Sequence, residues 1–176
     1  MKTSTAFRCI ALFAALGAAN VAAAEAPGYT MTVWMDSAYG GQVVSGRYAR
    51  AIDRLTHSPA RYANSAEGQT NLCVAYAKTG ELDKAIASCE RAVAVLEDSK
   101  YGQDRRRLTR VERQVSTALA IALSNRGVLR VANGQYELAS NDFRSAAELD
   151  TDVAAAATNL ERFEARQSDT PQIAAR

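Results

Sequence analysis

Apolar and small side chains recur at spacings of three and four along residues 71–97, which read NLCVAYAKTGELDKAIASCERAVAVLE. This period predicts two amphipathic helices, each with one stripe to bury. Thr79 and Gly80 interrupt the pattern, and glycine is a frequent turn residue, so the chain is expected to reverse there. The stretch therefore predicts a helical hairpin.

A second hairpin is predicted by residues 125–150, NRGVLRVANGQYELASNDFRSAAELD. Four of its positions repeat those of the first hairpin at one offset of 54 residues: Gly80, Ala85, Cys89 and Ala92 precede Gly134, Ala139, Phe143 and Ala146. A weaker copy lies 34 residues before the first hairpin, with Gly46, Ala51 and Leu55 in the matching places. Because one hairpin cannot bury both of its stripes, these units are expected to stack.

Two further segments complete the helical pattern. The offset of 54 instead of 34 implies an insertion of 20 residues, 100–119, which we expect to extend the first helix of the following unit. Residues 154–168 place Leu160 and Phe163 on one face and charges on the other, which predicts a terminal capping helix. Residues 169–176 are polar and are expected to form a flexible tail.

The two clear hairpins resemble the tetratricopeptide repeat (TPR), a helix-turn-helix unit of about 34 residues. Residues at the family's preferred positions carry the resemblance: Leu72, Tyr76, Gly80, Ala85 and Ala92 in one unit, and Gly127, Gly134, Ala139, Phe143 and Ala146 in the other. Cys73, Arg126 and Arg130 depart from the family pattern. The resemblance implies an all-α fold, a short array of antiparallel repeats with a C-terminal cap. Its units would span about 32–65 (degenerate), 66–99 and 120–153, with the cap at 154–168.

The first 24 residues are typical of a secretory signal peptide. Lys2 and Arg8 accompany an apolar stretch, and Ala22, Ala23 and Ala24 offer a cleavage site. The apolar stretch is shorter than the roughly 20 residues of a membrane span, so we expect a periplasmic or secreted protein with no span in the mature chain. The repeat domain would then cover residues 25–168. Tyr29 to Met35 alternate loosely, but an array has no sheet to receive a strand, so we expect irregular structure there.

Charge and residue types argue against catalysis. Removing the leader takes away two of the 21 basic residues and none of the 19 acidic ones, so the mature chain carries no net charge. This balance gives no indication of nucleic-acid binding. His57 is the only histidine, and no nucleophile motif or paired carboxylates accompany it. The sequence therefore predicts no catalytic residue, no metal site and no cofactor.

The resemblance implies that the first helix of each unit lines a concave face, which binds a peptide or protein partner. The residues expected on that face are Asn71, Val74, Lys78, Asn125, Val128, Asn159 and Arg162. The three asparagines recur at one repeat position. An asparagine amide both donates and accepts, so a row of them can hold an extended backbone. Alternatively, these asparagines tie neighbouring helices together. The function that we expect is a non-catalytic interaction scaffold of the bacterial cell envelope.

The insertion is rich in arginine and allows another function. Its basic residues are Arg105, Arg106, Arg107, Arg110 and Arg113. Arginine binds carboxylates and phosphates, so the alternative is a structural envelope protein that binds anionic polymer or lipid through this stretch. The plainer interpretation is a solvated helix face.

Cys73 and Cys89 are predicted to form a disulfide; the alternative is that both are small, reduced core residues. They lie seven residues before Gly80 and nine after it, so they face each other across the predicted hairpin. Both stand at TPR positions that normally contact the opposite helix, and an exported chain meets an oxidising environment in which paired thiols close.

Overall fold

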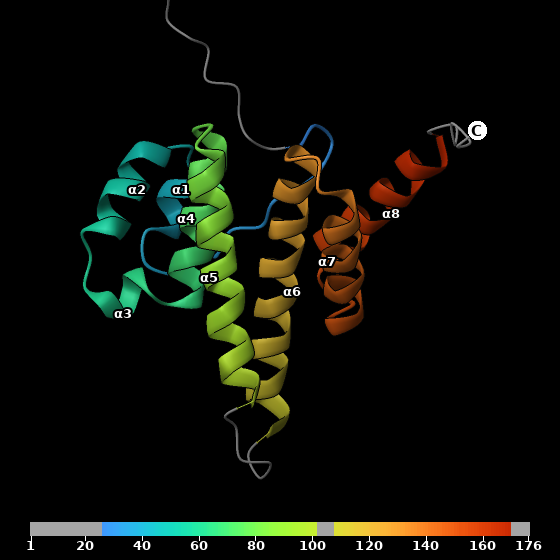
Figure 1. Ribbon diagram of the computed structural model, residues 1–176. Coiled ribbons are helices and arrows are strands. Elements are labelled where there is room, and N and C mark those ends of the chain that lie inside the picture. The colour runs from blue at the N-terminus through green and yellow to red at the C-terminus, as the bar shows by residue number, and fades with distance from the viewer. Residues whose placement is uncertain (1–25, 102–107, 170–176) are drawn as a thin grey trace, which may run out of the picture.

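The computed structural model describes residues 26–101 and 108–169, and within these ranges every regular element is an α-helix. The helices follow one another in a row that bends across the view of Figure 1. Their bounds are α1 Gly40–Val44, α2 Tyr48–Thr56, α3 Ala60–Ala63, α4 Ala66–Lys78, α5 Leu82–Tyr101, α6 Leu108–Ala132, α7 Tyr136–Leu149 and α8 Ala154–Asp169. The fold is an all-helical array, as the sequence predicts.

Helices α4 and α5 form the first clear hairpin. Ser65 caps α4, because its hydroxyl accepts a hydrogen bond from the backbone N–H of Gly68 at 3.0 Å. Gly80 ends the hairpin turn with a φ of +79°, a conformation that side-chain-bearing residues rarely adopt. Ala85 and Cys89 on α5 are fully buried against α4. The turn and the small contact residues lie where the repeat pattern predicts them.

Helices α6 and α7 repeat this hairpin, with Gly134 in the same left-handed conformation at φ +73°. Gly127 on α6 allows the two helices to approach closely. A Cβ atom at this position would lie only 2.6 Å from Cε1 of Phe143 on α7. Phe143 is fully buried and fills the space that the glycine leaves.

The inserted residues lengthen both helices that flank them. Helix α5 continues to Tyr101 and α6 already begins at Leu108, so the extra length is divided between the end of one unit and the start of the next. Figure 1 shows these two helices projecting together beyond the rest of the array. Of the basic residues in the insertion, Arg105, Arg106 and Arg107 lie outside the described residues, and Arg113 is exposed on α6.

The two ends of the array are covered differently. At the N-terminal end, Ala51 and Leu55 of α2 are fully buried, and α2 packs on α4 as a shortened first unit. At the C-terminal end, α8 packs on α6 and α7 and buries Phe163. The predicted leader, residues 1–24, and the tail beyond residue 169 lie outside the described residues. Among the helices that are described, none has the length and apolar character needed to cross a bilayer.

Candidate binding face

Residues 26–36 pass along the array instead of forming an element of their own. Figure 1 shows this segment, in blue, running behind α6 towards α1 and α4. It lies against one side of α4, α6 and α8, the side that carries Asn71, Asn125 and Asn159. We call residues 26–36 the N-terminal segment and this side of the three helices the asparagine face.

Each of the three asparagines binds one residue of the N-terminal segment through both backbone groups. Asn159 accepts from the N–H of Thr30 at 2.9 Å and donates to its carbonyl at 2.7 Å. Asn125 binds Thr32 in the same way, at 2.8 Å for both bonds. Asn71 binds Trp34 at 2.9 and 3.0 Å. The amide side chains therefore act on the segment as a neighbouring strand would.

The spacing of these contacts shows an extended chain. Residues 30, 32 and 34 are bound, and in an extended backbone every second residue presents its N–H and C=O to the same side. The direction is also defined, because the earlier residues of the segment lie on the last helix of the array. The N-terminal segment thus runs antiparallel to the order of the repeats.

Alternate side chains of the N-terminal segment enter the hydrophobic core. Tyr29 is buried and stacks on Phe143, with ring centroids 5.6 Å apart. Met31 and Val33 pack against Val74 and its buried neighbours. Burial raises the pKa of the Tyr29 hydroxyl, while the charge of Arg166 acts in the opposite direction. The segment is therefore attached both through backbone hydrogen bonds and through apolar side chains, and Trp34 contributes to both because its ring also packs against the core.

A tight turn fixes the C-terminal end of this segment. The carbonyl of Trp34 accepts from Asn71 and from the hydroxyl of Ser37 at 2.8 Å, and the same hydroxyl accepts from Nδ2 of Asn71 at 2.7 Å. Gly40, the first residue of α1, approaches so closely that a Cβ atom there would lie 1.9 Å from the Trp34 oxygen. The turn leaves no room for a side chain at this glycine.

Alanine at Gly40 is therefore expected to lower the free energy of unfolding by about 1–3 kcal/mol, the usual cost of overpacking. The matched control is Gly41→Ala on the same helix, where a Cβ atom meets nothing within 4 Å. Because alanine favours a helix over glycine, that change should stabilise by up to about 1 kcal/mol. Urea denaturation of both variants measures the difference, and equal effects would contradict the close approach of the turn.

The N-terminal end of the segment is held by two exposed arginines of α8. Nη1 of Arg162 donates to the carbonyl of Gly28 at 2.5 Å, and Nη2 of Arg166 donates to the carbonyl of Pro27 at 2.6 Å. The guanidinium of Arg166 also lies over the ring of Tyr29, 5.0 Å from its centroid. These contacts continue the series of polar groups that begins at Asn71.

Most of the residues expected to bind a partner come together on the asparagine face, but the chain itself covers much of it. Asn71, Asn125 and Asn159 are fully buried beneath the N-terminal segment. Val74 and Val128 are buried in the core beside it, whereas Lys78 is half-buried and Arg162 is exposed. Their role towards a partner stays a prediction. A contact also fits the alternative interpretation, in which the asparagines tie neighbouring helices together. Asn159 of α8 donates to Ser124 of α6 at 3.0 Å.

The predicted disulfide between Cys73 and Cys89 is present, with a Cα–Cα distance of 5.2 Å. It joins α4 to α5 within the hydrophobic core, and both cysteines are fully buried. Its position is structural, since it lies inside the hairpin.

A salt bridge of the buried Asp142 on α7 with two half-buried arginines of α6 was not predicted. Asp142 accepts from Arg126 at 2.7 and 3.0 Å and lies 2.7 Å from Nη1 of Arg130. Both arginines are departures from the TPR pattern. A charged residue on a stripe that is predicted to be buried is the sequence feature from which this salt bridge could have been predicted. A carboxylate held by two guanidinium groups satisfies charges that would otherwise be costly to bury.

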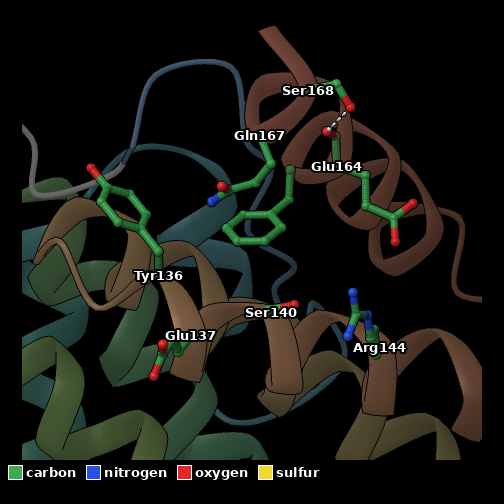
Figure 2. A pocket seen from close by; sticks show the side chains of 8 residues that line it. Tyr136, Glu137, Ser140, Arg144, Glu164, Gln167 and Ser168 are labelled. Atoms are coloured by element: carbon green, nitrogen blue, oxygen red, sulfur yellow. Dashed lines mark hydrogen bonds between the residues drawn. The ribbon is translucent and has the colours of Figure 1, made fainter. Parts of the chain in front are cut away.

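A hollow lies between α7 and α8. It is open, has a volume of about 480 Å³ and is lined by Tyr136, Glu137, Ser140, Arg144, Phe163, Glu164, Gln167 and Ser168. Figure 2 shows the Glu164 and Arg144 side chains on one side of it and Tyr136 on the other. Across the described ranges, no three histidine, cysteine or acidic side chains gather as metal ligands would. The exposed His57, which follows the last residue of α2, contacts Asp53 of that helix.

In comparisons with known proteins, no family model and no curated protein sequence matched the chain. Among solved structures, the NMR structure of the second TPR domain of human RPAP3, in complex with the HSP70 peptide SGPTIEEVD, is similar. It is 24% identical with a TM-score of 0.52, and the match covers 70% of this chain and 87% of the RPAP3 domain. The chain therefore has the TPR-like helical-repeat fold that its two clear hairpins predict.

Proposed function

We propose that this chain is a non-catalytic protein-interaction scaffold of the bacterial cell envelope. The observation that supports it most is the asparagine face, where three amide side chains bind both backbone groups of alternate residues in one extended segment. Such contacts depend on the backbone and therefore suit a peptide ligand of varied sequence. The segment found there belongs to the chain itself, and it indicates the kind of polypeptide that this face accepts.

The likeness to the RPAP3 domain adds a second argument. That domain was solved in complex with a peptide, so one array of this fold binds a short linear segment. For the present chain the partner is proposed to be a peptide or a segment of a protein. The placement in the cell envelope rests on the predicted leader, residues 1–24, and on the disulfide, which is typical of oxidising compartments.

A photoreactive side chain at Arg162 tests this function in the producing cell. Arg162 is exposed at the edge of the asparagine face, and a matched probe at the exposed Asp83 on α5 serves as the control. We expect a crosslink to a second polypeptide from position 162 and none from position 83. Intact-mass measurement of the same envelope protein should show that residues 1–24 are absent.

Two outcomes would count against the proposal. Equal crosslinking from both positions would indicate random contact and not binding at this face. A protein that keeps its first residue, Met1, in the envelope fraction would contradict the exported form.

A further inference from the structure

We propose that the N-terminal segment is a displaceable internal ligand, which occupies the asparagine face until an external extended peptide of similar pattern replaces it. This inference rests on the proposed function and adds the class of partner and its regulation. The pattern is an aromatic residue followed by apolar residues at the second and fourth positions, as in Tyr29, Met31 and Val33. The residues between them must retain a backbone N–H.

The first argument is the nature of the contacts. The three asparagines hydrogen-bond to the backbone of Thr30, Thr32 and Trp34 and not to their side chains. Any extended chain that lacks proline at these positions can offer the same groups. Through these hydrogen bonds, the asparagine face cannot distinguish the backbone of the N-terminal segment from that of a second polypeptide.

The side chains supply the selectivity that the backbone lacks. Tyr29 stacks on Phe143 and is enclosed with Val128 and Phe163, so this place suits an aromatic ring. Met31 packs against three of the hydrophobic clusters and Val33 against one. A peptide with charged residues at these alternate positions would have to bury unpaired charges, which is costly.

The two ends of the N-terminal segment are held unequally. Trp34 is fixed by Asn71, by Ser37 and by the close approach of Gly40. Residues 27 and 28 are held by Arg162 and Arg166, whose side chains are exposed to water. Opening should therefore begin at α8 and proceed towards the turn. The part of the asparagine face formed by α6 and α8 becomes available first.

Attachment within the same chain gives the segment a strong competitive advantage. A tethered ligand acts at an effective concentration of about millimolar, so a free peptide binds only to the fraction of molecules that are open. Weakening the internal segment without changing the helices should raise the apparent affinity for a free peptide. That response separates a displaceable ligand from a fixed part of the core.

Binding of a fluorescent peptide with the sequence of residues 26–36 measures this competition. The variant is Thr32→Pro in the full chain, which removes the N–H that Asn125 binds, and the matched control is Thr32→Ala, which keeps it. By fluorescence anisotropy, we expect Thr32→Pro to bind the peptide about tenfold or more tightly than the parent chain, because the lost bond raises the open fraction. Thr32→Ala should bind close to the parent value.

Peptide variants test the recognised pattern. We expect the Thr32→Pro chain to lose its tighter binding when the tyrosine of the peptide is changed to alanine, and also when the two threonines of the peptide are changed to proline. Equal affinity of Thr32→Pro and Thr32→Ala for the unmodified peptide would overturn the proposal, provided that both chains keep their helical circular dichroism.

Amide hydrogen exchange on the unmodified chain decides the matter even if Thr32→Pro fails to fold. We expect the N–H groups of Thr30 and Thr32 to exchange at least about tenfold faster than those of buried helix residues such as Leu129, because local opening precedes global unfolding. Equal protection would overturn the internal-ligand proposal alone, since a crosslink from Arg162 would still support a scaffold. Fast exchange with no crosslinked partner would instead contradict the proposed function.

Discussion

Replacing Phe143 with alanine is expected to lower the free energy of unfolding by about 3–5 kcal/mol, the usual loss when a fully buried phenylalanine is truncated. Phe143 is fully buried and lies between Tyr29 and Phe163, at ring-centroid distances of 5.6 and 5.5 Å. Gly127 opposite provides no side chain that could move into the cavity. The loss should therefore include both the transfer of the ring and the cavity that it leaves.

Urea denaturation followed by circular dichroism measures this loss. The matched control is Leu138→Ala on the same helix, because Leu138 is 46% exposed and its removal leaves no cavity. We expect the control to change the stability by less than about 1 kcal/mol, as for most surface positions. A loss below about 1 kcal/mol for Phe143→Ala would mean that the ring does not connect the N-terminal segment to α7 and α8.

Removing the disulfide is the second large change. The double variant Cys73→Ala, Cys89→Ala is expected to lose about 3 kcal/mol of stability, because the bridge closes a loop with a sequence separation of 16 residues and restricts the unfolded chain. Alanine is suited to both positions, which lie in a core of small and apolar residues. Most of the loss should therefore come from the missing bridge.

A reducing agent provides the control for this experiment. It should lower the midpoint of urea unfolding of the parent chain and leave that of the double variant unchanged. Unfolding curves of the parent chain that coincide with and without reductant would show that the bridge contributes nothing to stability. Two free thiols per chain in the denatured, unreduced exported form, which lacks residues 1–24 and with them Cys9, would rule out the bridge itself.

The hairpins were predictable because their information is local. Gly80 and Gly134 mark turns that need a positive φ, and Ala85, Ala139 and their neighbours mark close helix contacts. These residues recur at one offset, so periodicity alone indicates two equivalent units. The pairing of Cys73 with Cys89 followed from the same hairpin, because residues equally far from a turn lie opposite each other.

How the inserted residues are divided between α5 and α6 was less evident from the sequence. The apolar stripe from Leu108 onwards correctly indicates that α6 begins early, but the continuation of α5 to Tyr101 leaves no separate signal. The ion pair of Asp142 with Arg126 and Arg130 is similar in this respect. Charges at positions where the TPR pattern expects apolar residues are visible in the sequence, whereas their mutual contact requires α6 and α7 to be packed.

Sequence alone determined the repeat fold, the turns and the recurrence of asparagine at one repeat position, because each can be recognised within a unit and by its period along the chain. Only the tertiary structure decided what the asparagines bind. The alternation of Tyr29, Met31 and Val33 is typical of a strand, yet its hydrogen-bond partners are side chains from three helices, separated from it by 37, 93 and 129 residues. The helical period of the sequence does not show that asparagine side chains can form the hydrogen bonds that a neighbouring strand would otherwise form. Their alignment arises only when stacking places α4, α6 and α8 side by side.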